Sequence, residues 1–171
     1  MRSIDIHAHI VPNSLWTAAD AKTDWFGFRH EAGEGLGTMV GGGMRTHFTS
    51  PKVRYSVAER LKDMDEQKVD VQVLSIHTPL VGYHLDAAQG LALARNVNDE
   101  IAATTRQQPK RLAGLATLPV QDVKSAIDEL ERSVTKLGLK GAMLDTNVNG
   151  EQWDEPKFLP LFKAAEQMGA M

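Results

Sequence analysis

The sequence predicts an α/β fold in which parallel strands alternate with helices that cover them. Short apolar strand patterns and amphipathic helical patterns follow one another four times in the same order along the chain. Two architectures satisfy this alternation: a doubly wound open sheet and a barrel of eight such units. The first strand is not followed by the glycine-rich turn of a dinucleotide-binding fold, which weakens the open-sheet alternative.

The first element is a strand over residues 4–10, where apolar residues alternate with polar ones until Pro12. The segment from about residue 13 to 52 has neither a helical nor a strand period, although six glycines gather between Gly33 and Gly43. Several aromatic side chains precede these glycines, and disordered linkers usually lack aromatic residues. We therefore expect a functional loop inserted after the first strand.

The rest of the chain divides into regular elements. Ser56, with Glu59 three residues later, predicts a capping box that begins the next helix. Gly138 and Gly169 follow the last two predicted helices, as C-terminal capping residues do. In chain order the pattern predicts a strand over 69–76, a helix over 86–108, a strand over 111–118, a helix over 122–137, a strand over 140–144 and a helix over 156–168.

Composition excludes several classes of protein. The formal net charge of −3 lacks the basic excess typical of nucleic-acid binding, and 42% hydrophobic residues suffice for a globular core. No apolar run approaches the ~20 residues that a membrane helix needs. Cysteine is absent, so disulfides and thiolate metal sites are excluded. The N-terminus has a strand pattern instead of a signal peptide, and we expect a cytoplasmic protein without nucleic-acid or membrane partners.

The chain is short for the barrel that its pattern favours. An eight-unit barrel typically needs ~250 residues, whereas this chain has 171. The last residues also follow a helix-closing glycine, where the next strand would begin. We expect residues 1–171 to form the N-terminal half of one barrel domain, its first four βα units, with the inserted loop at about 13–52.

His7 and His9 are the strongest candidates for a functional site. Residues i and i+2 of a strand project to the same face, ~6.6 Å apart along the backbone at ~3.3 Å per residue. Two neutral imidazoles at that spacing can bind one divalent ion such as zinc. Asp5 has the same spacing and is expected on the same face as an acceptor for a ligand. The alternative is a purely structural histidine pair at a strand end.

The sequence pattern gives weaker evidence that the other four histidines belong to a functional site. His77 ends the second strand and is expected to line the pocket at the barrel mouth, and His84 follows in the same loop. His30 and His47 lie in the glycine-rich segment, where we expect exposure to solvent.

Several stretches together resemble the amidohydrolase superfamily, in the decarboxylase branch that includes aminocarboxymuconate semialdehyde decarboxylase. The likeness runs almost from end to end and keeps its order, which makes it far more specific than a single histidine pair. The stretches that carry it are Ile4-Asp5-Ile6-His7-Ala8-His9-Ile10-Val11-Pro12, Arg60-Leu61-Lys62-Asp63-Met64-Asp65, Val69-Asp70-Val71-Gln72-Val73-Leu74-Ser75, Asn98-Asp99, Arg111 to Pro119, and Leu137-Gly138-Leu139-Lys140-Gly141.

The resemblance implies a (β/α)8 TIM barrel that binds one divalent metal ion, zinc first and manganese as the alternative. His7 and His9 correspond to the two ligands on the first strand. The third histidine ligand, the aspartate ligand and the acid/base histidine would follow Met171. Arg45, after Gly41-Gly42-Gly43-Met44, stands where the family has an arginine that binds the substrate carboxylate, and a guanidinium suits that task. His77 is a second, weaker candidate for substrate binding.

The resemblance therefore implies a metal-dependent, non-oxidative decarboxylase of a small unsaturated or aromatic carboxylic acid. The metal and Arg45 would hold the substrate, which is protonated at the carbon bearing the carboxylate and then loses carbon dioxide. One alternative is a hydrolase or hydratase of the same superfamily that acts on a lactone or an alkene. Another is a non-catalytic domain with a structural histidine pair. Family members are often dimers, and the aromatic segment offers a contact surface for a homodimer.

Overall fold

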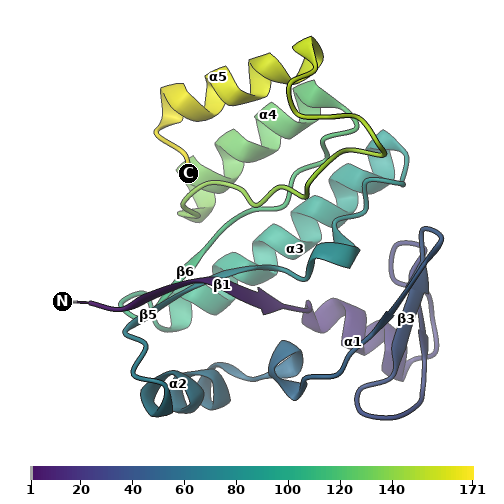
Figure 1. Cartoon of the computed structure of the whole chain (residues 1–171), viewed down its shortest axis with the longest axis vertical. Helices are drawn as coiled ribbons and strands as arrows, with labels where there is room; N and C mark the ends of the chain where they lie inside the picture. The colour runs from purple at the N-terminus through teal and green to yellow at the C-terminus, as the bar shows by residue number, and fades with distance from the viewer. Residues whose placement is uncertain (1) are drawn as a thin grey trace.

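The main sheet of the protein is parallel, and its strands follow one another in chain order. The structure, a computed structural model, describes residues 2–171 (Figure 1). The sheet order is β1 (Ile4–Ile10), β5 (Val71–Ile76) and β6 (Leu112–Gly114), with both neighbouring pairs parallel. This order confirms the predicted α/β class with a parallel sheet, and sequential neighbours are what a barrel requires.

The predicted strand over 140–144 is reduced to a single parallel bridge between Ala116 and Ala142. Around this bridge, Lys140 donates its N–H to the carbonyl of Gly114, and Ala116 donates to Gly141. Met171 extends the same pattern, because its N–H bonds the carbonyl of Lys140 and its carbonyl accepts from Ala142. The segment therefore continues the parallel arrangement beyond β6, although too few of its residues are paired for it to be a regular strand.

The helices follow the sequence prediction closely. The Ser56 side chain accepts from the Glu59 N–H, and the Glu59 side chain accepts from the Ser56 N–H, which confirms the capping box. Gly138 (φ 77°) and Gly169 (φ 61°) adopt the left-handed conformation that ends a helix. The helices are α2 (Val57–Glu66), α3 (Ala87–Gln107), α4 (Val123–Arg132), which continues into a π-helical turn over Ser133–Leu137, and α5 (Leu159–Met168), with 3-10 turns at Pro51–Arg54, Thr78–Leu80 and Pro156–Phe158.

The inserted segment is not the irregular loop that the sequence predicts. It contains a helix, α1 (Asn13–Asp20), and a small antiparallel sheet of β2 (Arg29–Glu31), β3 (Thr38–Gly41) and β4 (Met44–His47). Its strands have only three or four residues, too few to produce a readable alternation. Gly42 and Gly43 form the two-residue turn between β3 and β4, and both have the positive φ that such a turn requires.

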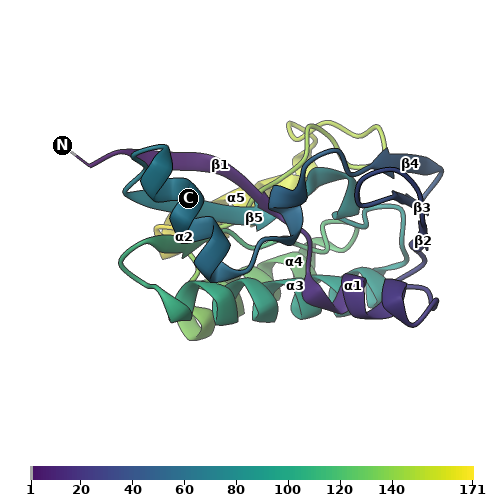
Figure 2. The ribbon, with the colours of Figure 1, turned by 90° about the horizontal axis from the view of Figure 1, so that it is seen from below.

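Aromatic side chains attach the inserted segment to the rest of the molecule. Trp16, Trp25, Phe28 and Phe48 are all buried in the hydrophobic core. The ring centroids of Trp16 and Phe48 lie 5.4 Å apart, so α1 contacts the residue that follows β4. The segment is thus an ordered part of the fold, next to the carboxyl end of β1 (Figures 1 and 2).

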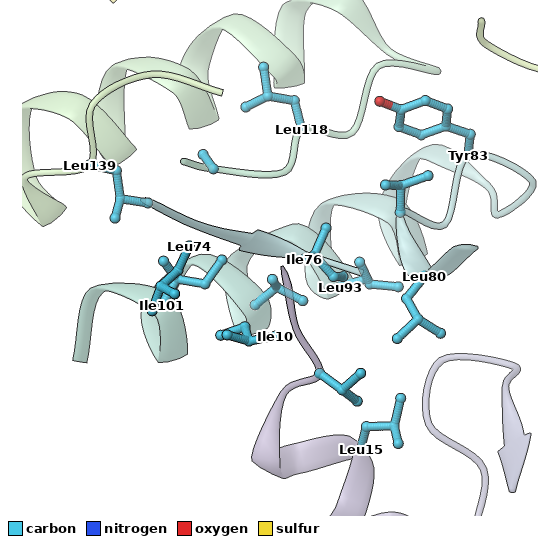
Figure 3. Close-up of a cluster of buried hydrophobic side chains, with 14 of the residues drawn as sticks. Ile10, Leu15, Leu74, Ile76, Leu80, Tyr83, Leu93, Ile101, Leu118 and Leu139 are labelled. Carbon is cyan, nitrogen blue, oxygen red and sulfur yellow. The ribbon is translucent and has the colours of Figure 1, made fainter. Parts of the chain in front are cut away.

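The core lies between the parallel sheet and the helices that cover one of its faces. Leu74 and Ile76 of β5 point toward α3, where Leu93 and Ile101 are completely buried (Figure 3). Viewed from below, α3 and α4 lie on the same side of the sheet (Figure 2). Helices on one face leave the opposite face of the strands free to carry a site. Within residues 2–171, no helix is both long enough and apolar enough to cross a membrane.

A β-bulge in β1 changes which of its side chains lie on the same face of the sheet. Asp5 pairs with Gln72 and Ala8 pairs with Leu74, so β1 has one residue more than β5 between these pairs. Asp5 therefore lies opposite Gln72 on the helix-covered face that also carries Leu74. His9 lies opposite Ser75, on the other face. The prediction that Asp5 shares a face with the histidines is wrong, because the extra residue breaks the alternation.

Candidate metal site

The side chains of His7 and His9 meet at the carboxyl half of β1. Their Nε2 atoms lie 3.0 Å apart, and their ring centroids are 4.7 Å apart with the planes nearly perpendicular. Nε2 of His7 and Nε2 of His9, which can both bind a metal ion, thus lie close together. The spacing of residues i and i+2 in a strand predicts this convergence, and the structure has it despite the bulge between Asp5 and Ala8.

Ser75 orients the second of these rings. Its Oγ lies 3.1 Å from Nδ1 of His9. When Nδ1 carries the proton and donates it to Ser75, the lone pair of Nε2 is free for a metal ion. Burial lowers the pKa of His9, and the neighbouring His7 ring lowers it further. The imidazole of His9 therefore stays in the neutral, metal-binding form below its usual titration range.

His77 extends the row of imidazole rings. It follows β5, is half-buried, and its ring centroid lies 5.7 Å from that of His9 and 5.6 Å from that of Phe48. Burial also lowers the pKa of His77, and His9 contributes to this shift. The structure therefore brings His77 beside the histidine pair, although it is not among the residues that line the cavity next to that pair.

The imidazoles of His7 and His9 are chemically suited to form part of a metal site. Two neutral imidazoles suit zinc and other divalent transition metals. In the part of the chain that the structure describes, no group of three or more His, Cys, Asp or Glu side chains is arranged to hold an ion. The residues present therefore supply two ligands, and a catalytic zinc site normally has three protein ligands and an open position.

A polar cavity of about 190 Å³ adjoins the histidine pair. Besides the two histidines, its lining includes charged and amide side chains from β1, β5, α2, the residue after α2 and the 3-10 turn before it: Asp5, Lys52, Arg60, Asp63, Gln67 and Gln72. Sequence reasoning missed Arg60 and Ser75 as site residues. Both occur in the stretches that carry the family resemblance, which was the available signal.

Arg45 lies on β4 and is not among the residues that line this cavity. Its guanidinium is exposed and donates to the carboxylate of Glu31 at 2.7 Å. Of the remaining histidines, His47 is exposed as expected. His30 is half-buried, contrary to expectation, because it bonds the carbonyl of Leu36 and packs against Trp16.

Comparison with known proteins identifies the family. The sequence profile described as "Amidohydrolase" matches residues 4–171. The chain belongs to the amidohydrolase family. It is 34% identical over 174 residues to the 2-amino-3-carboxymuconate-6-semialdehyde decarboxylase of Dictyostelium discoideum, covering 98% of this chain and 46% of that protein. It is also 38% identical over 103 residues to the gamma-resorcylate decarboxylase of a Polaromonas species, covering 60% of this chain and 30% of that protein.

Solved structures resemble this amidohydrolase over nearly its whole length. The 5-carboxyvanillate decarboxylase of Sphingomonas paucimobilis has 30% sequence identity and a TM-score of 0.75, covering 99% of this chain and 50% of that one. A dihydroxybenzoic acid decarboxylase of a Polaromonas species, solved with bound manganese, has a TM-score of 0.66 at 22% identity, covering 99% of this chain and 48% of that one. At this identity the second likeness shows the fold alone. The chain spans about half the length of the curated relatives that it matches, 46% of the one from Dictyostelium.

Proposed function

We propose that the protein is a metal-dependent decarboxylase that removes carbon dioxide, without oxidation, from a small aromatic or unsaturated carboxylic acid. The convergence of His7 and His9 Nε2 at 3.0 Å carries the proposal, because it supplies part of a metal site in a chain that resembles decarboxylases. Those relatives act on aromatic or unsaturated acids, as their names state. The hydrolase or hydratase alternative has no such support among them.

His7 and His9 would hold one divalent ion, and we propose zinc because two imidazole ligands suit it. Manganese is the alternative, as it is bound in the dihydroxybenzoic acid decarboxylase. When bound, such an ion polarises a substrate oxygen and lowers the pKa of coordinated water. Ser75 would keep Nε2 of His9 directed at the ion through its contact with Nδ1.

Arg45 and His77 are the proposed substrate-binding residues. The Arg45 guanidinium already pairs with one carboxylate, that of Glu31, which is the chemistry that a carboxylic acid substrate would require. His77 lies beside His9 and Phe48, so a ring bound next to the histidines would contact it. The role of Arg45 follows from the family resemblance, whereas that of His77 follows from its position at the end of β5, beside His9.

We further propose that residues 1–171 are the first four units of a (β/α)8 barrel. The sequential parallel order of β1, β5 and β6 and the length of the relatives support this. The remaining ligands and an acid/base histidine would then follow Met171. A cytoplasmic location and a homodimer remain predictions.

The test is a carbon dioxide release assay with γ-resorcylate, 5-carboxyvanillate and aminocarboxymuconate semialdehyde, on a chain that includes the ligands and the acid/base histidine proposed to follow Met171. Decarboxylation should disappear after chelation and return when zinc or manganese is added. The His7→Ala variant should lack the activity at every metal concentration. Full turnover by the chelated protein would overturn the proposal, and ring opening without carbon dioxide would favour the hydrolase alternative.

A further inference from the structure

Arg60 of α2 is a buried cation directly behind the histidine pair. Only 6% of the residue is exposed to solvent. Its Nη1 donates to Oε1 of Gln72 at 2.8 Å, and its Nη2 donates to the main-chain carbonyls of His9 and Lys52, each at 3.3 Å. All these acceptors are neutral oxygens. A buried guanidinium in such surroundings is costly unless its charge is compensated nearby.

The carboxylates of Asp63 and Asp5 compensate this charge, and Asp5 is linked to Arg60 through the side chain of Gln72. Nε2 of Gln72 donates to Oδ2 of Asp5 at 2.9 Å, and the other oxygen, Oδ1, accepts the main-chain N–H of His7 at 3.0 Å. Chemistry determines the direction of these bonds. The Arg60 guanidinium can only donate, so Oε1 of Gln72 faces Arg60 and Nε2 of Gln72 donates to the carboxylate of Asp5.

The three hydrogen-bonded residues Arg60, Gln72 and Asp5 are called the clamp. At its two ends the clamp bonds the main chain of both candidate ligands. One end bonds the carbonyl of His9 and the other bonds the N–H of His7. The bulge, where β1 has one residue more than β5, lies between Asp5 and Ala8 and so includes His7, at one of these two contacts. A one-residue slip of a strand moves its side chains to the opposite face. The clamp thus opposes any shift that would separate the two Nε2 atoms.

We propose that Arg60, Gln72 and Asp5 are positioning residues that fix His7 and His9 for metal binding by bonding the main chain at both. This inference rests on the proposed metal site. The three residues line the same cavity as the histidines, but their hydrogen bonds to His7 and His9 reach only the main chain, so they act through the backbone of β1. Removing a group that orients metal ligands typically costs about 10- to 100-fold in metal affinity.

Three variants distinguish a role in positioning the metal ligands from a role in the stability of the fold alone. Asp5→Asn keeps the volume but has one acceptor oxygen where the clamp uses two, so either the Gln72 or the His7 bond is lost. Arg60→Met removes the cation at similar length. Arg132→Met is the matched control, because Arg132 is also a largely buried arginine, bonded to Glu129 and Asp99 and remote from the clamp.

In a chain that includes the ligands proposed to follow Met171, the experiment measures zinc affinity by competition with a chromophoric chelator, together with the absorption spectrum of the cobalt form and the urea midpoint. Asp5→Asn and Arg60→Met should weaken zinc binding at least tenfold and change the cobalt spectrum. Arg132→Met should lower the urea midpoint while zinc affinity stays within twofold.

Zinc affinity within twofold of wild type in Asp5→Asn, with an unchanged cobalt spectrum, would overturn the clamp. Because this variant is isosteric, it decides the question even where Arg60→Met does not fold. The His7→Ala variant tests the proposed metal site separately from the clamp. If it retains wild-type zinc affinity, the metal site itself is contradicted, whatever the clamp variants do.

Discussion

Arg45 on β4 bonds Glu31 on β2 across the intervening strand β3, with 2.7 Å between Nη2 and Oε2. The hydrogen bonds from Arg45 and then from Arg29 lower the pKa of the Glu31 carboxyl, so it is ionised at neutral pH. The proposed substrate-binding guanidinium therefore already has a carboxylate partner in the structure. Any carboxylic acid substrate must compete with Glu31 for Arg45.

We predict that Glu31→Gln lowers the KM for the carboxylic acid substrate severalfold, since Arg45 is then released. Arg45→Met should raise KM by about tenfold, the scale expected for losing a hydrogen bond to a charged group. Arg29→Gln is the control, because it removes the other partner of Glu31 and leaves Arg45 in place. Steady-state kinetics checks this; an unchanged KM in both Glu31→Gln and Arg45→Met would exclude Arg45 from substrate binding.

Metal content provides a second prediction. In a chain that includes the ligands proposed to follow Met171, His7→Ala and His9→Ala should each reduce bound zinc from about one ion per chain to a small fraction, because the loss of one ligand leaves the site incomplete. His47→Ala is the control: His47 is exposed on β4 and contacts the hydroxyl of Thr38. Elemental analysis after dialysis measures the content. Loss of zinc in His47→Ala alone would place the metal elsewhere.

Alkaline stability depends on Tyr83. Burial raises the pKa of its hydroxyl to about 12. Between about pH 10 and 12 the unfolded chain loses this proton while the folded protein keeps it, so rising pH favours unfolding. Two units correspond to about 3 kcal/mol of lost stability by pH 12.

The comparison of Tyr83→Phe with Tyr55→Phe checks this prediction. Urea unfolding at several pH values should show a shallower alkaline decline in Tyr83→Phe, because that variant has no buried hydroxyl to titrate. Tyr55→Phe should retain the decline of the wild type. Identical slopes in all three proteins would show that Tyr83 ionises at its ordinary pH.

The capping box of α2 predicts a fourth outcome. Ser56→Ala removes the acceptor for the Glu59 N–H and should lower the free energy of unfolding by about 1 kcal/mol. Ser56→Asn, which keeps an acceptor at the same place, should retain most of that stability. Urea denaturation measures both, and equal losses in the two variants would assign the effect to something other than the cap.

The sequence predicted the elements that depend on local signals. The Ser56–Glu59 capping box, the glycines that end helices and the spacing of His7 and His9 act over four residues or fewer, and all have the expected geometry. The small antiparallel sheet was missed because strands of three or four residues show no period.

The bulge was not readable from the sequence because it exists only in the pairing of β1 with β5. Asp5 was therefore assigned to the wrong face. Arg60 was missed for the same reason: its partners Gln72 and His9 are 12 and 51 residues away in the chain. Such side-chain bonds follow from tertiary structure and leave no local pattern.

The ordered insertion between β1 and α2 also has a kinetic consequence. Because of it, Ile4 of β1 must find Val71 of β5, about twice the separation of a minimal strand–helix–strand unit of ~30 residues. A doubling of loop length costs only about 0.6 kcal/mol of closure entropy, but contacts between distant residues slow folding. The β1–β5 pair should therefore form late, and early folding of the segment from α1 to β4 would accelerate this pairing by shortening the effective loop.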